Sequence, residues 1–189
     1  GCKTELLDVD GNTLARSYRE YPLIYPRTAW VEHDAETGWW QATVDTTREV
    51  LAKSGVDSKE IKGVSISCTN ALVAVDKSGK PLRPAIMQFD KRTISQVNWI
   101  KEKVGDKVIR LTGNQPAASG TSAPIILWMK ENEPELFAKT HQFLWPGGFV
   151  IHKLTDRFTM EWSRASWTCL FETGGKQKWS EELCNAMDI

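Results

Sequence analysis

The chain has 189 residues, 41% of them hydrophobic, which is enough to bury one core but leaves no room for two complete domains. Its 24 basic and 24 acidic residues cancel, which argues against a nucleic-acid or anionic-membrane partner. No apolar run is long enough to cross a bilayer and the first residues lack a signal-peptide pattern, so we expect a soluble, cytoplasmic protein with a small-molecule partner.

The cysteines and histidines are widely spread and fit no metal-ligand spacing. They are Cys2, Cys68, Cys169, Cys184, His33, His141 and His152. We therefore predict reduced, structural thiols and no metal site.

The N-terminal part of the chain is predicted to begin in a sheet. Residues 3–9 alternate in the manner of a strand, residues 10–12 are typical of a turn, and residues 13–21 resume the extended pattern, which indicates a β-hairpin. Asp34 can then cap a helix that Gly55 ends.

More strands are predicted in the next segment. Residues 61–67 and 71–76 are short apolar runs, and a turn leads from the second run to residues 84–87. Thr93 begins a sequence of capping-box form, so a helix with an apolar face is expected directly after residues 90–92.

Helices dominate the rest of the predicted chain. Pro124 and Pro134 each suit the first turn of a helix, another helix is expected around residues 149–154, and Ser180 can cap a last one. Residues 158–162 and 168–171 are interpreted as strands. The elements together predict an α/β fold with a mixed sheet flanked by helices.

Familiar catalytic motifs are absent from the sequence. It contains no phosphate-binding P-loop, no G-x-S-x-G, no H-E-x-x-H and no G-x-G-x-x-G. Ligands of α/β proteins bind beyond the carboxyl ends of strands, so polar residues that follow apolar strands are the best candidates.

Two segments meet this criterion, residues 67–70 and residues 89–92. The first contains Thr69 and Asn70, and the second contains Asp90 and Arg92. Carboxylate oxygens accept from sugar hydroxyls while Arg and amide groups donate to them, which suits a polyol ligand. From the residues alone, an ordinary turn at Asn70 and a helix cap with an ion pair at Asp90 remain open as alternatives.

The order of several segments resembles the FGGY family of carbohydrate kinases, and most closely its xylulose-kinase-like members. The similarity runs almost from end to end. It comprises residues 1–8, Trp30-Val31-Glu32-His33-Asp34, residues 82–92 ending in Phe89-Asp90-Lys91-Arg92, Leu111-Thr112-Gly113-Asn114, Ser122-Ala123-Pro124, Leu127-Trp128, Pro146, Lys153-Leu154-Thr155, Ser163, Ala165-Ser166 and Trp179-Ser180-Glu181-Glu182-Leu183. Each segment alone is a weak signature, but their common order is specific.

The resemblance implies a ribonuclease-H-like, actin-type ATPase fold and a function in carbohydrate metabolism. Full-length members transfer the γ-phosphoryl group of ATP, with Mg²⁺, to a sugar hydroxyl between two domains. Residues 1–189 would be the N-terminal, sugar-binding domain, without the family's first strand and without the nucleotide-binding C-terminal domain. The catalytic general base is then expected downstream of Ile189, so this chain alone is expected to be nearly inactive.

The resemblance also implies roles for individual residues. Thr69 and Asn70 occupy the place where xylulose kinases have Met-His and glycerol kinases have Arg-Glu, and Asp90 and Arg92 match the family's aspartate and arginine. These four are the predicted substrate-binding residues, and Lys3 is the predicted phosphate-binding residue. Gln88 stands where relatives have Trp and Ile125 where xylulose kinases have Lys, so the resemblance implies neither xylulose nor glycerol as substrate.

Three hypotheses remain open at this point. The chain is a fragment of an active ATP-dependent sugar kinase, a non-catalytic sugar-binding or interaction module with the kinase fold, or a structural domain without a ligand. An isolated domain would expose the apolar face that its partner domain covers, so a homodimer is a further expectation.

Overall fold

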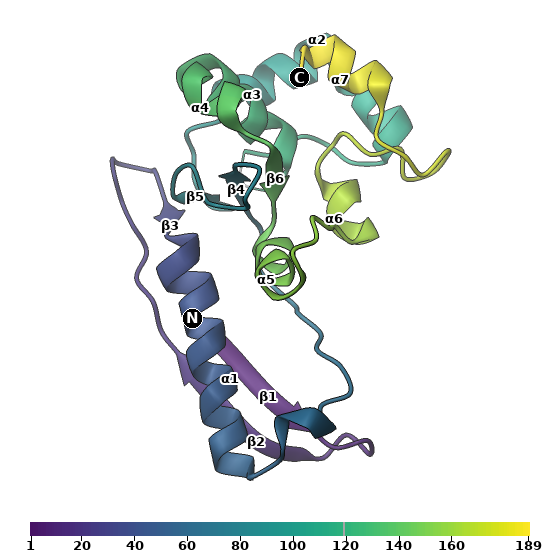
Figure 1. Ribbon diagram of the computed structural model, residues 1–189. Helices are drawn as coiled ribbons and strands as arrows, with labels where there is room; N and C mark the ends of the chain where they lie inside the picture. Colours follow the sequence, from purple (N-terminus) through teal and green to yellow (C-terminus); the bar gives the residue numbers. More distant parts are fainter. Residues whose placement is uncertain (119) are drawn as a thin grey trace.

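The computed structural model describes residues 1–118 and 120–189 of the chain, and it contains two sheets flanked by helices (Figure 1). The first sheet is the antiparallel hairpin of β1 (Cys2–Leu7) and β2 (Thr13–Arg19). The second sheet has the order β3-β5-β4-β6. Its strands are β3 (Glu32–His33), β4 (Ala71–Val75), β5 (Ala85–Met87) and β6 (Gln142–Leu144).

The hairpin forms as predicted because its turn is held by one side chain. The Asp8 carboxylate accepts hydrogen bonds from the backbone N–H groups of Asp10 and Asn12. One face of the hairpin packs on helix α1 (Gln41–Ser54), where Thr4 and Thr46 share a hydrogen bond of 2.6 Å between their hydroxyls. The hairpin and α1 therefore make a small layer of their own, visible in the lower half of Figure 1.

The predicted cap and end of this helix are confirmed. The Asp34 carboxylate accepts from the N–H of Thr37 and begins a π-helical stretch, Ala35–Trp40, that continues directly into α1. Gly55 ends α1 in the left-handed conformation, at φ +69°, which a glycine adopts without strain.

The central strand β4 is buried on both faces, and this divides the core into two clusters. Leu72 and Ala74 face helices α2 (Ile94–Thr112) and α3 (Ser122–Asn132). The alternate residues, such as Val73, face α5 (Pro146–Thr155) and the aromatic ring of Phe149. Successive side chains of a strand point to opposite faces, so this alternation also fixes the direction of the residues just before β4.

The remaining short elements are helical. They are the 3-10 turn Ser58–Glu60 and the helices α4 (Pro134–Lys139), α6 (Trp162–Trp167) and α7 (Glu181–Met187). Pro134 begins α4 and the Ser180 hydroxyl caps α7, as predicted. Within the described residues, no helix is long and apolar enough to span a membrane.

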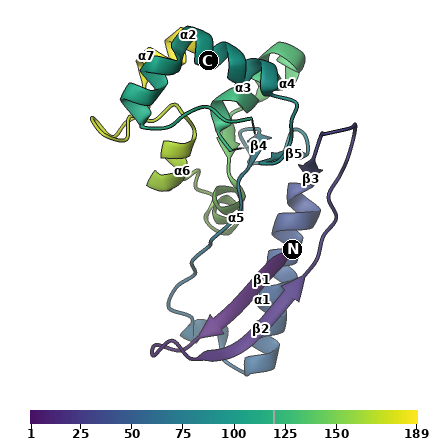
Figure 2. The same ribbon diagram turned by 180° about the vertical axis from the view of Figure 1, so that it is seen from behind.

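Three strand predictions are wrong, and one of them is residues 168–171, where a turn is followed only by a single bridge between Phe171 and Trp179. Residues 61–70 run extended between the two sheets but form no strand, as the view from behind shows (Figure 2). A strand needs a hydrogen-bonded neighbour, and β1 pairs only with β2 in the part of the chain described. Residues 158–161 also form no strand, and a helix begins at Trp162 because the Glu161 carboxylate accepts from the N–H of Ser163.

Burial of Cys169 gives the core a pH dependence that can be measured. Burial raises the pKa of the Cys169 thiol from 9.0 to about 11. The unfolded chain therefore releases this proton near pH 9, while the folded chain keeps it up to about pH 11. The contribution of the Cys169 thiol to the free energy of unfolding is thus fully present below pH 9 and is lost as the pH rises through 11. We expect the free energy of unfolding in urea to fall more between pH 8 and 11 in the wild type than in Cys169→Ala. Parallel falls in the two proteins would contradict this expectation.

Candidate functional site at the ends of β4 and β5

The two polar segments predicted to bind a ligand do lie side by side. The backbone N–H of Gln88, just after β5, donates to the carbonyl oxygen of Asn70, just before β4, at 3.0 Å. This bond extends the antiparallel pairing of β4 and β5 by one step. The segments around Asn70 and Asp90 therefore meet at one end of the second sheet.

Strand alternation nevertheless sends their side chains to two different cavities. Thr69, Met87 and Phe89 line a wide cavity of about 660 Å³ on the face of the sheet nearest the hairpin. Asn70 and Gln88 line a small recess of about 10 Å³ on the opposite face, beside α3. Neighbouring residues of an extended chain point in opposite directions, so Thr69 and Asn70 do not share one wall.

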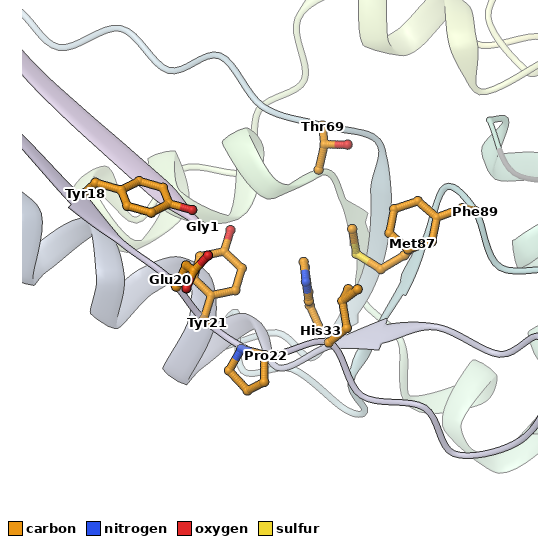
Figure 3. Close-up of a pocket in the computed structure, with 10 residues that line it drawn as sticks. Gly1, Tyr18, Glu20, Tyr21, Pro22, His33, Thr69, Met87 and Phe89 are labelled. Carbon is orange, nitrogen blue, oxygen red and sulfur yellow. The ribbon is translucent and has the colours of Figure 1, made fainter.

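The wide cavity lies between the hairpin and the second sheet (Figure 3). Tyr18, Glu20 and Tyr21 approach from the hairpin side, while Thr69 and Phe89 approach from the other. Its lining mixes apolar side chains with five that can form hydrogen bonds: Tyr18, Glu20, Tyr21, His33 and the exposed Thr69.

His33, at the base of this cavity, is held in the neutral form. Burial, and secondarily the charge of the N-terminal amine, lower the pKa of His33. Its Nδ1 accepts from the Trp39 indole N–H at 3.2 Å, and that acceptor role requires an unprotonated nitrogen. The wide cavity therefore offers a neutral imidazole rather than a cation.

The recess has a different chemistry, because it gathers polar groups that lack partners. Nine residues line it: Asn70, Ala71, Leu72, Gln88, Gly120, Thr121, Ser122, Ile125 and Trp145. Ser122 and Trp145 are almost fully buried, yet the Ser122 Oγ and the Trp145 Nε1 have no hydrogen-bond partner among the described residues. A buried polar atom without a partner costs about 1–3 kcal/mol, so each is a place where an external oxygen atom would be stabilised.

Helix α3 contributes to the same recess through its first turn. Thr121 is its N-cap and Ser122 its first residue. The N-terminus of a helix carries a partial positive charge that favours oxygen acceptors. The recess therefore combines a helix end, an indole N–H, a hydroxyl and two carboxamides, and none of its lining residues is acidic.

Asp90 and Arg92 lie outside both cavities. The Asp90 carboxylate is 1% exposed and accepts from the backbone N–H of Val31 at 2.6 Å and from the Arg92 backbone and guanidinium at 2.8–2.9 Å. Arg92 also pairs with Glu32 at 2.8 Å and stacks over the Trp30 ring, 3.9 Å from its centroid. Glu32 in turn pairs with Arg83, whose guanidinium reaches Glu133 at 2.8 Å.

From the sequence, Asp90 could be either a sugar contact or a member of an ion pair, and these contacts correspond to the ion pair. The carboxylates of this buried network and most of its guanidinium nitrogens pair with one another or with the backbone, but the buried Arg92 Nη1 has no hydrogen-bond partner among the described residues. The network ties β3 to the junction between β5 and α2. It therefore positions the strand ends without lining a cavity.

Lys3 lies next to the wide cavity, because it pairs across the hairpin with Tyr18 of the cavity lining. Its side chain is exposed on the first strand of the hairpin and lines neither the wide cavity nor the recess. No group of three or more His, Cys, Asp or Glu side chains is placed to hold a metal ion within residues 1–118 and 120–189.

Sequence reasoning missed Ser122 and Trp145 of the recess, and it missed Arg164, which contacts the recess residue Asn70. Arg164 lies in α6 and donates to the Asn70 Oδ1 and, at 2.5 Å, to the Cys68 carbonyl oxygen. Its guanidinium also lies over the Trp145 ring, 5.2 Å from the centroid. Because Arg164 is 94 residues from Asn70 in the chain, no local pattern could have linked the two.

Comparison with known proteins identifies a single family along the chain. Residues 1–189 match the model of the N-terminal domain of the FGGY family of carbohydrate kinases. A xylulose kinase of Bacillus subtilis is 36% identical over 188 residues, covering 99% of this chain and 37% of the relative. A glycerol kinase of Thermococcus onnurineus is 31% identical, over 97% of this chain and 38% of the relative.

Solved structures agree with this result at the level of the fold. The structure of a xyloylose kinase from Brucella ovis superposes with a TM-score of 0.90 at 23% identity, over 99% of this chain and 38% of that one. A gluconate kinase from Lactobacillus acidophilus gives a TM-score of 0.88 at 22% identity, over 99% of this chain and 37% of that one. The chain thus spans well under half the length of the proteins it matches.

Proposed function

The chain belongs to the FGGY family of carbohydrate kinases, and on that premise we propose that it supplies the sugar-binding side of an ATP-dependent kinase. The reaction is transfer of the γ-phosphoryl group of ATP to a hydroxyl of a sugar or polyol. The observation that carries this proposal is the recess at the ends of β4 and β5, where buried hydrogen-bonding atoms without partners surround Asn70 and Gln88.

We assign contact with the sugar to Asn70 on the recess side. Its carboxamide can hydrogen-bond to sugar oxygens, and the sugar would also satisfy the indole of Trp145 and the hydroxyl of Ser122. Thr69 lies on the other side of the strand end, so its predicted sugar contact would have to come through the wide cavity. Asp90 and Arg92 are assigned an indirect role in place of a contact, because they line neither cavity and the Asp90 carboxylate already accepts from Val31 and Arg92.

The proposed roles of the nucleotide and the metal rest on the family. ATP would supply the phosphoryl group, and Mg²⁺ would neutralise its developing charge. The exposed Lys3 remains the proposed contact of this chain with the transferring phosphate. The general base that accepts the hydroxyl proton is not assigned to any described residue. The proposal includes a cytoplasmic location, a small-molecule partner rather than nucleic acid or membrane, and a homodimer.

A substrate panel tests the proposal. The complete gene product that contains this chain would be given ATP and Mg²⁺ with pentoses, hexoses, ketoses and polyols in turn, and ADP release would be measured. We expect one group of related sugars or polyols to give sustained turnover. Binding of a sugar in calorimetry without turnover would favour a non-catalytic sugar-binding module. The absence of both binding and turnover for every compound would overturn the proposal.

A further inference from the structure

Arg164 contacts two residues of the recess, Asn70 and Trp145, and has no role in the reaction proposed above. It lies in the short helix α6, and its guanidinium reaches across to the strand end before β4. One nitrogen donates to the Asn70 Oδ1, a second donates to the Cys68 carbonyl oxygen, and Nε lies 3.3 Å from a Glu161 carboxylate oxygen. The side chain is 23% exposed, so these contacts are largely sheltered from water.

These contacts fix the orientation of the Asn70 carboxamide. An Asn side chain has one oxygen, which accepts, and one NH₂ group, which donates two hydrogen bonds. Because the Arg164 guanidinium occupies the oxygen, the NH₂ group is the part of Asn70 that remains for a ligand in the recess. Without Arg164, either end of the carboxamide could turn toward the ligand.

Two other features of the recess are also donors, whereas the free Ser122 hydroxyl can both donate and accept. The Trp145 Nε1 can only donate a hydrogen bond, and the first turn of α3 presents the positive end of the helix dipole. No carboxylate lines the recess, and the charge of Arg164 lies at its edge. A volume of about 10 Å³ admits one water-sized group, so the recess takes one oxygen-bearing end of a ligand rather than a whole sugar.

We propose that Arg164 is a positioning residue that makes the recess select a substrate end with an acceptor oxygen, a carbonyl or a carboxylate, over a hydroxymethyl group. This inference rests on the sugar-kinase function proposed above and specifies which sugars it favours. A carbonyl or carboxylate oxygen accepts from Asn70 and Trp145 together. A hydroxymethyl oxygen also accepts, but its own proton then needs an acceptor, which the Ser122 hydroxyl or the Gln88 carboxamide would have to supply.

The first experiment compares three forms of one carbon skeleton in the complete gene product. The best substrate of the panel sets the configuration; for a xylose skeleton the three compounds are D-xylulose, D-xylonate and xylitol. We expect kcat/KM for the ketose or the aldonate to exceed that for the alditol by at least about tenfold. The better substrate of the ketose and the aldonate tells whether the recess prefers a carbonyl or a carboxylate oxygen. Equal kcat/KM for all three would overturn the inference and leave the proposed kinase function intact.

Three variants separate positioning from mere structural support. Arg164→Gln should raise KM for the preferred compound about tenfold, with little change for the alditol, and Arg164→Lys should recover part of that loss. Asn70→Asp keeps a partner for Arg164 but replaces the NH₂ donors by an acceptor, so it should shift the preference toward the alditol. The matched control, Arg110→Gln, removes an exposed arginine that pairs with Glu182 and should leave the preference unchanged.

A structural role alone predicts a different pattern. In that case Arg164→Gln and Asn70→Asp would lower kcat/KM for all three compounds by the same factor, which would overturn the inference. Thermal unfolding of each variant shows whether it folds, and Asn70→Asp decides the question should Arg164→Gln fail to fold. If no compound of the panel binds or turns over, the proposed function itself fails, and the inference fails with it.

Discussion

Replacing Asp90 with alanine is expected to lower the free energy of unfolding by about 3–5 kcal/mol, because it leaves buried charges and a buried N–H group without their partner. The Asp90 carboxylate accepts from Val31 and from Arg92, whose side chain is fully buried. Urea unfolding followed by tryptophan fluorescence measures the loss.

Two further variants make this result specific. Asp90→Asn keeps the shape and one acceptor oxygen but removes the charge, so its loss should be smaller than that of Asp90→Ala. Glu102→Ala, which breaks an exposed pair with Lys103, should change stability very little. A loss of less than about 1 kcal/mol for Asp90→Ala would show that the network is not structural, and would restore Asp90 as a candidate for direct sugar contact.

Replacing Asn70 with alanine is expected to lower kcat/KM for the sugar about 10- to 100-fold in the complete gene product, with a small effect on folding. Asn70 is half-buried and its side chain takes part in no backbone ladder, so its removal leaves the core intact. The substrate, in contrast, loses hydrogen bonds that the protein cannot replace from water inside the recess.

Thr69→Ala provides the matched control, because Thr69 is the neighbouring residue on the opposite face of the same segment. If the sugar binds in the recess, Thr69→Ala should lower kcat/KM much less than Asn70→Ala. A larger effect of Thr69→Ala would instead place the sugar in the wide cavity near the hairpin.

Local signals in the sequence predicted the elements that depend on local contacts. The Asp34 cap, the glycine after α1, the proline that begins α4 and the Ser180 cap all act within a few residues. Residues 61–67 illustrate the limit of this reasoning. Their apolar pattern fits a strand, but strand formation depends on a partner elsewhere in the chain, and none pairs with them in the described part.

The candidate site shows the same division between local and distant information. The sequence indicated that the segments at Asn70 and Asp90 both follow strands, which holds for Asp90 but not for Asn70, because residues 61–70 form no strand and Asn70 precedes β4. The bond between Asn70 and Gln88 shows that the two segments meet. The sequence did not reveal that Glu32 and Trp30 lie against Arg92 and occupy it. It also could not reveal Arg164, because tertiary packing alone brings α6 to the strand end.

The central claim is that a sugar oxygen enters the recess beside Asn70, and nuclear magnetic resonance of the isotope-labelled chain tests it most directly. The indole N–H of Trp145 has no partner among the described residues, so its signal should respond strongly when a ligand oxygen accepts from it. During titration with the sugar that the panel identifies, we predict saturable shifts of the Trp145 indole, the Asn70 carboxamide and the Ser122 amide. Saturable shifts confined to the hairpin of β1 and β2, with these three signals unmoved, would contradict the account.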